Sequence, residues 1–242
     1  MRFALISDLH GNVPAVEAVL ADARHQGVDA VICLGDVATL GPHPREILDL
    51  LRDCVCLLGN HDEFLLDAQL IHTYTEAPII VDAVEWCRSE LRSSDLAFLA
   101  GFQRTFEVGL AGAGTLSLFH GTVRSNMENL LAFTPPDELD AMLAGRRAEV
   151  LAGGHTHVPM LRQHRGMWVV NSGSVGMPFR EYAFGGPPDL VPGADYAIVE
   201  GGPSGIAVNL RHVDVDARRL RTAISGSSMP LAPRLRGIYA GW

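Results

Sequence analysis

The residues of this chain that could do chemistry lie in five short islands between residues 8 and 157. Each island combines glycine or leucine with aspartate, asparagine or histidine, and most follow an apolar run. Carboxylate, amide and imidazole groups gathered in this way could form a two-metal hydrolytic site. One such island would be weak evidence, whereas five in this order are strong. The islands are Asp8-Leu9-His10, Gly35-Asp36, Gly59-Asn60-His61-Asp62, His120-Gly121 and Gly154-His155-Thr156-His157.

The spacing of these side chains suits a pair of cations. Asp8 and His10 are two residues apart in an extended turn, so both side chains can point the same way toward one ion, and His155 and His157 are again two residues apart. Asp36 offers two carboxylate oxygens, which can bridge cations about 3.5–4 Å apart. A mixed nitrogen and oxygen set favours a catalytic metal pair over a closed structural zinc. Because any one pair alone is more often a chance occurrence, this interpretation depends on all five islands.

Alternating predicted strands and helices position the islands. Apolar runs at residues 2–7, 30–34 and 54–58 predict buried strands, and residues 14–26 and 44–52 between them have helical spacing. This alternation within 60 residues predicts a parallel sheet with crossover helices. We therefore expect an α/β fold in which the islands follow strand ends.

The second half of the chain predicts further strands, and no linker separates it from the first half. Because the islands fall in both halves, we expect one domain over residues 1–242 with a core of two sheets. The segment 222–242 has clustered glycine, serine and proline and no acidic residue, and whether it wraps the surface or contacts a neighbouring subunit is left open. The other predicted elements are helices at 62–70, 78–91 and 135–143 and strands at 104–108, 115–119, 149–152, 160–163, 167–171, 196–200 and 206–213.

The composition excludes several classes of protein. With 48% apolar and 19% charged residues, a chain of 242 residues is expected to be compact and neither disordered nor coiled. Its net charge of −9 disfavours a general DNA or RNA binder, while small anionic substrates stay compatible with bound cations. The four cysteines lack the spacing of a secreted framework. The opening apolar run is too short for a signal peptide or a membrane span, so we expect a cytoplasmic protein without membrane contact.

The five islands in this order resemble the motifs of the calcineurin-like metallophosphoesterase superfamily. The runs at 6–12 (Ile-Ser-Asp-Leu-His-Gly-Asn), 41–44 (Gly-Pro-His-Pro) and 171–176 (Asn-Ser-Gly-Ser-Val-Gly) are similar to its small bacterial and archaeal phosphodiesterase branch. The resemblance covers about residues 1–215. It implies a four-layer α/β/β/α sandwich with two mixed sheets and a dinuclear metal site at the strand ends.

The resemblance also implies the role of each island. Four side chains would hold a first divalent metal ion: Asp8, His10, Asp36 and His157. Four would hold a second, with the aspartate shared as a bridge: Asp36, Asn60, His120 and His155. Manganese is the metal expected first, and iron, zinc, nickel and cobalt suit the same ligands. His61 would be the general acid that protonates the leaving-group oxygen.

The chemistry of phosphoryl transfer supports these roles. Two cations polarise the phosphoryl group and lower the pKa of a bridging water, which gives a hydroxide for in-line attack. The leaving alkoxide needs a proton, and an imidazole with an ordinary pKa of about 6.5 can supply it. Asp62 either orients a neighbouring ring or backbone, or is simply a carboxylate at a helix N-terminus.

One departure separates this chain from the protein serine/threonine phosphatases of the superfamily. Those enzymes carry an acidic residue three positions after the Gly-Asp aspartate, followed by an arginine. Here the two positions are Thr39 and Leu40. His61 is therefore expected to lack that acidic partner, and the resemblance to protein phosphatases weakens.

Four side chains outside the islands are candidates for substrate contacts. Arg124 and Arg180 could each bind a phosphate or nucleotide group, or be solvated surface arginines. His72 and Tyr74 follow the third island and could shape a pocket. The turn at 171–176 could bind an anion through its backbone N–H groups, but we expect it to brace the loop of the fifth island instead.

Together these inferences predict a metal-dependent phosphohydrolase, with a phosphodiesterase of small phosphoesters or cyclic nucleotides favoured. A phosphomonoesterase is the alternative within enzymes. A non-catalytic scaffold of the same fold, like the retromer subunit similar to this family, is less favoured because every motif residue is present. We expect a small-molecule phosphoester as partner and no polymeric nucleic acid. The sequence is compatible with either a monomer or an oligomer.

Overall fold

The first three apolar runs form the parallel part of one sheet. The computed structural model describes residues 1–242, and in it β1 (Arg2–Ile6), β2 (Ala30–Cys33) and β3 (Val55–Cys56) pair in parallel. The predicted final hairpin, β9 (Ala194–Gly202) and β10 (Gly205–Val213), adds to the free edge of β1. The strand order is β10-β9-β1-β2-β3. The predicted parallel pairing and the antiparallel hairpin are both confirmed.

The second half of the chain forms a second five-stranded sheet with the order β4-β5-β6-β8-β7. Its three central strands are parallel, and an antiparallel strand closes each edge. The edge strands have mixed burial, whereas every residue of the central β6 is buried. The strands are β4 (Phe106–Gly109), β5 (Thr115–Leu118), β6 (Val150–Gly153), β7 (Met160–His164) and β8 (Met167–Asn171).

The two sheets pack against each other through alternate side chains of their strands. On β1, Phe3 and Leu5 face the second sheet, while Ala4 and Ile6 face the helices on the other side. This two-residue alternation explains why the run is apolar throughout, since both faces of the strand are covered. The core between the sheets also includes Leu118 of β5.

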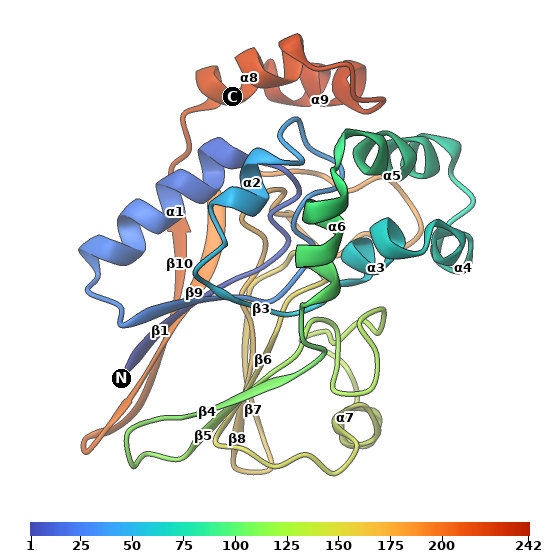
Figure 1. Cartoon of the computed structure of the whole chain (residues 1–242). Coiled ribbons are helices and arrows are strands. Elements are labelled where there is room, and N and C mark those ends of the chain that lie inside the picture. Colours follow the sequence, from blue (N-terminus) through green and yellow to red (C-terminus); the bar gives the residue numbers. More distant parts are fainter.

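Helices cover the outer face of each sheet, which completes the predicted four-layer α/β/β/α sandwich (Figure 1). The layer over the first sheet contains α1 (Val13–His25), α2 (Glu46–Asp49), α3 (Asn60–Leu66), α5 (Pro78–Glu90) and α6 (Ser93–Ala100), and the second sheet is covered by α7 (Pro136–Leu143). Two short turns, η1 (Ala68–Leu70) and α4 (Ile71–Tyr74), connect α3 to α5. None of the helices combines the length and the apolar content that a membrane-spanning segment needs.

Several predicted boundaries were wrong. The helix expected from residue 62 begins at Asn60, directly after Gly59, because the Asp62 carboxylate accepts a hydrogen bond from the Gly59 N–H and closes the first turn. The helix α6 was not predicted, although the Asp95 carboxylate accepts from the Arg92 N–H and marks its start. The expected helix at 44–52 shrinks to the four residues of α2.

The C-terminal segment forms a helical hairpin that packs on its own chain. Asp216 caps α8 (Ala217–Gly226), and α9 (Ala232–Tyr239) follows after a short turn. Buried apolar side chains of both helices pack against Ala83 of α5 and against Met177 and Leu190, which follow the second sheet. The hairpin therefore covers the same end of the molecule where the five islands meet (Figure 1).

Candidate metal centre

The five islands meet because each follows a strand of the parallel parts of the two sheets. Asp8 and His10 follow β1, Asp36 follows β2, and Asn60 follows β3. In the second sheet, His120 follows β5, and His155 and His157 follow β6. The carboxyl ends of these strands point to one edge of the sandwich, which is where α/β folds place their ligands.

Two neighbouring triads of candidate metal ligands result. In the first, one ligand atom from each of Asp8, His10 and His157 lies within 4.8 Å of the others. In the second, Asp36, His120 and His155 meet the same criterion. Each triad falls within one of the two ligand sets implied by the sequence. All six side chains are buried.

The remaining candidate ligand, Asn60, and the expected bridge, Asp36, both lie beside His120 of the second triad. The Oδ1 atom of Asn60 is 3.2 Å from Nε2 of His120, and Oδ2 of Asp36 is 3.4 Å from the same nitrogen. Oδ1 of Asp8, which belongs to the first triad, is 3.9 Å from Nε2 of His120. The two triads are therefore contiguous, as a dinuclear centre requires.

Backbone carbonyls orient two of the imidazoles. Nδ1 of His120 donates to the carbonyl of Leu34 at 2.8 Å, and Nδ1 of His157 donates to that of Met177 at 2.7 Å. Because a carbonyl can only accept, these bonds place the ring proton on Nδ1 in each neutral ring. The Nε2 lone pair of each ring is then free to face the centre, an arrangement typical of histidines that bind metals.

The groups that converge here fit a divalent cation. Nε2 of His10 and Nε2 of His157 are 3.1 Å apart, and Oδ1 of Asp8 is 3.3 Å from the latter. This Oδ1 atom is buried and has no hydrogen-bond partner. A buried carboxylate oxygen beside two imidazole nitrogens is costly unless a cation or a proton lies among them. The donor set of imidazole nitrogen and carboxylate oxygen suits the metals that the sequence suggested.

The electrostatics keep three of the candidate ligands, His10, His155 and Asp8, in metal-binding form. Burial lowers the pKa of His10 to about 3 and that of His155 to about 4, so both rings are neutral near pH 7. Burial alone would raise the pKa of Asp8, but His157 and His120 hold it well below its usual range. The ring of His120 differs. Burial opposes its protonation, yet Asp36 and Asp8 raise its pKa to about 10. A bound cation would replace that proton, since metal binding releases protons from its ligands.

His61 lies on the first turn of α3 with its ring in the cavity above the triads. Its backbone N–H donates to Oδ1 of Asp36 at 2.8 Å, and its ring meets that of His10 edge-on with 5.3 Å between centroids. Its Nδ1 atom is buried without a hydrogen-bond partner, so no acidic side chain pairs with it. Thr39 lies near the Nδ1 atom of His10 instead, at 3.5 Å. Burial lowers the pKa of His61.

Asp62 orients backbone and no ring. Its carboxylate accepts hydrogen bonds from the N–H groups of Asp36 at 2.8 Å, Val37 at 2.9 Å and Gly59 at 2.9 Å. Burial raises the pKa of this carboxyl to about 7, while these hydrogen bonds oppose the rise. Asp62 therefore clamps the loop that carries the expected bridging ligand and also caps the first turn of α3, so both roles considered from the sequence are present.

Backbone strain concentrates in the islands. Nine non-glycine residues of the chain have left-handed backbone, and five of them are candidate ligands, with φ between 44° and 70°. Each such residue costs about 1–2 kcal/mol, and strain of this kind clusters at functional sites. Close packing adds a further constraint, because a Cβ atom on Gly59 would lie 2.0 Å from Oδ1 of Asp36. The five ligands are Asp8, His10, Asp36, His155 and His157.

The turn at residues 171–176 braces the centre, as expected. The Asn171 amide donates to the carbonyl of Gly154 at 2.5 Å and to Oγ1 of Thr156 at 3.0 Å. The Ser174 hydroxyl donates to the carbonyl of Asp8 at 2.8 Å. These bonds tie the first and fifth islands together through one turn.

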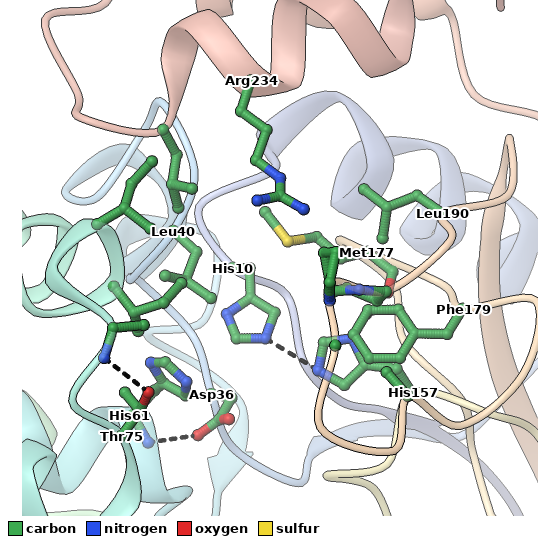
Figure 2. Close-up of a pocket in the computed structure, with 18 of the residues that line it drawn as sticks. His10, Asp36, Leu40, His61, Thr75, His157, Met177, Phe179, Leu190 and Arg234 are labelled. Atoms are coloured by element: carbon green, nitrogen blue, oxygen red, sulfur yellow. Dashed lines mark hydrogen bonds between the residues drawn. The ribbon is translucent and has the colours of Figure 1, made fainter.

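A cavity of about 660 Å³ opens above the triads, a size that suits a nucleotide-sized ligand. His10, Asp36 and His61 are among its 25 lining residues, of which 13 are hydrophobic. Figure 2 shows the Arg234 side chain extending from α9 toward Met177 and His10.

Only one of the four predicted substrate contacts lines this cavity. Tyr74 does, with its ring edge-on to that of His61 at 5.9 Å between centroids. The other three predicted residues lie outside it, and each of them pairs with an acidic side chain near in sequence. The pairs are Arg124 with Glu128, Arg180 with Asp189 at 2.7 Å, and His72 with Glu76 at 3.7 Å.

Sequence reasoning missed four polar residues of the cavity. Thr75, Asn129, Tyr182 and Arg234 line it, and they come from segments far apart in the chain. The three loop residues carried no periodic or motif signal. The two arginines of the segment 222–242, which has no acidic residue, were a usable signal for Arg234.

Comparison with known proteins agrees with this geometry. Residues 1–185 match the family model of the calcineurin-like phosphoesterase superfamily domain. Phosphodiesterase YfcE of Escherichia coli is 27% identical over 190 residues, which cover 74% of this chain and 81% of that protein. An uncharacterized protein of Methanocaldococcus jannaschii is 26% identical over 72% of this chain and 76% of its own length.

A solved structure is similar over nearly the whole length. The metallophosphoesterase from Sphaerobacter thermophilus is 25% identical, has a TM-score of 0.76, and is matched over 99% of both chains. The similarity therefore includes the C-terminal helical hairpin, which lies beyond the family model. With the family model covering three quarters of the residues, the chain belongs to the calcineurin-like phosphoesterase superfamily.

Proposed function

We propose that this protein is a dinuclear metal-dependent phosphodiesterase of small phosphoesters. The observation that carries the proposal is the pair of contiguous buried triads, Asp8-His10-His157 and Asp36-His120-His155, at the floor of a ligand-sized cavity. Buried carboxylates and imidazoles arranged around two neighbouring points are the ligand pattern of two-metal phosphoester hydrolysis.

Each metal would be held by one triad completed by a neighbouring side chain. Asp36 would serve both ions as a bridge, and Asn60 would complete the second set with its amide oxygen. When bound, such a pair supplies Lewis-acid polarisation of the phosphoryl group and activates water for in-line attack. The chain's part is to hold His10 and His155 neutral and Asp8 ionised.

His61 would protonate the leaving-group oxygen. Its ring lines the cavity beside His10, and its Nδ1 atom has no partner in the protein that would compete for a proton. Burial lowers the pKa of this ring, so the negative charge of a bound phosphoester would be needed to stabilise its protonated form. The proton held on His61 would then pass to the departing alkoxide.

The apolar walls of the cavity support a diester in preference to a monoester. A diester carries a second organic group on phosphorus, and Tyr74 and Phe179 are placed to contact such a group. The similarity to phosphodiesterase YfcE supports the same choice.

Comparing rates on two aryl esters tests this choice. We expect manganese-loaded protein to hydrolyse bis(p-nitrophenyl) phosphate with a higher kcat/KM than p-nitrophenyl phosphate, and metal-free protein to hydrolyse neither. A higher kcat/KM for the monoester would favour the phosphomonoesterase alternative. Activity that survives complete metal removal would contradict the proposal.

A further inference from the structure

The wall of the cavity opposite the candidate metal centre is formed by α9, which lies outside the region matched by the family model. The helix is held there by buried Leu235 and Tyr239, which pack with Met177 and Leu190 in one apolar cluster. Because the helix is anchored in this way, the positions of the side chains that it directs toward the cavity are fixed.

Arg234 is the arginine that α9 contributes to the cavity. Its side chain is exposed, makes no ion pair or hydrogen bond within the protein, and reaches down toward the candidate centre (Figure 2). Two other arginines of the hairpin have partners. Arg219 pairs with Glu17 at 2.7 Å, and Arg221 donates to the carbonyl of Tyr239. A guanidinium with five free donors directed into a cavity is suited to bind a planar or tetrahedral anion.

The charge distribution of the cavity is complementary to an anionic ligand. Of its 25 lining residues, Asp36 is the one carboxylate and Arg234 the one arginine or lysine. Asp36 belongs to the candidate metal centre, so no carboxylate competes for the guanidinium at the other end. Bound divalent cations would make the centre itself strongly attractive to phosphate.

The surface between the two cationic ends is largely apolar. Leu40, Ile79, Phe179 and Leu190 line this stretch, and the Phe179 ring stacks on that of His157 with 4.2 Å between centroids. A ligand that spans the cavity would therefore place an apolar or aromatic part here and its charged groups at the two ends.

We propose that Arg234 binds a second phosphoryl group of the substrate. The preferred substrate class is then a small phosphoester in which an apolar or aromatic moiety separates the scissile phosphate from a further phosphate. This inference rests on the proposed function for the phosphate at the metal centre. It goes beyond that function because it assigns the other end of the cavity and names the chemistry recognised there.

A series of non-hydrolysable ligands tests the proposal. The probes are alkane α,ω-bisphosphonates of increasing chain length and the corresponding alkyl monophosphonates, titrated calorimetrically into the manganese-loaded full chain. For at least one length, we expect the bisphosphonate to bind about tenfold more tightly than its monophosphonate. A tenfold difference in affinity corresponds to about 1.4 kcal/mol, which a charge-assisted contact can supply. Arg234→Met should abolish this gain, and Arg234→Lys should keep part of it.

Arg236→Met is the matched control, since Arg236 is exposed on the same helix and does not line the cavity. This variant should keep the full gain. The proposal is overturned if no bisphosphonate exceeds its monophosphonate, if Arg234→Met retains the gain, or if Arg236→Met loses it equally. Because binding is measured without turnover, failure of the protein to hydrolyse aryl phosphoesters would contradict the proposed function and leave this test intact.

Discussion

At the scale of single residues, Asp62 shows how the centre is supported by a side chain that faces away from the cavity. Its two oxygens accept three backbone N–H groups from the loops of the second and third islands. Those loops carry Asp36 and Asn60, the candidate bridge and a candidate ligand. A carboxylate with three buried donors is difficult to replace, because a side chain with fewer acceptor oxygens leaves at least one N–H without an acceptor.

We expect Asp62→Asn to destabilise the fold and weaken metal loading together. The Asn amide would turn its NH₂ group toward one of the three backbone donors, which costs about 1–3 kcal/mol for the unsatisfied group. Chemical denaturation and elemental analysis of the metal content would measure both effects. Asp67→Asn, at the exposed end of the same helix, is the control and should change neither. A fully loaded, equally stable Asp62→Asn protein would contradict this role.

Residue types and their neighbours in the sequence also explain which site residues could be predicted. The candidate metal ligands could be recognised because their residue types and spacing can be read directly from the sequence. Arg124 and His72 were less suited to a substrate role, since each has a glutamate four residues later that pairs with it. The sequence does show such neighbours, and they favour a local ion pair over a free cation.

At the scale of elements, one half-buried carboxylate ties α1 to the final hairpin. Oδ2 of Asp22 accepts from the Tyr196 hydroxyl at 2.6 Å and from Nε of Arg211 at 2.7 Å. The Arg211 guanidinium is the main reason that the pKa of Asp22 is lowered. The ionised form is therefore stabilised by folding, and its contribution is present above the unfolded pKa of about 3.9.

We expect Asp22→Asn to lower the free energy of unfolding by about 1–2 kcal/mol near pH 7, as hydrogen bonds to a charged group contribute. The difference from the unchanged protein should stay constant down to about pH 4. It should then shrink as the pH falls through the lowered folded pKa, since the carboxylate becomes protonated in both states. Urea denaturation across pH 3–7 measures this. Asp53→Asn, at an exposed carboxylate without a partner, is the control, and a difference that grows at low pH would contradict the account.

Helices and strands with a long apolar pattern could be predicted. Prediction failed where the pattern was short. The strands before the islands and the helices at 13–25 and 78–90 follow clear periodicity, and their prediction was confirmed. The helix α6 is only eight residues long and its start depends on the cap by Asp95, so periodicity alone gave little signal. The C-terminal helices are held mainly by contacts with residues distant in sequence, which composition does not reveal.

At the scale of the whole molecule, the cavity is formed by four separate regions. The sandwich supplies the candidate metal centre at its strand ends, the segments that contain Tyr74 and Phe179 supply walls, and the C-terminal hairpin supplies Arg234. The family resemblance predicted the sandwich and the positions of the islands because these belong to the fold. It did not predict the walls, because they depend on where the hairpin docks.

The central claim is that the chain holds two metal ions and uses His61 as the acid. The most direct measurement is the turnover of His61→Ala on bis(p-nitrophenyl) phosphate, with the metal content determined on the same sample. General acid catalysis contributes about 10²–10⁴-fold, so we predict a loss of at least about 10²-fold with two manganese ions still bound per chain. Asp36→Ala, by contrast, should lose metal. Full turnover in a metal-loaded His61→Ala protein would contradict the account.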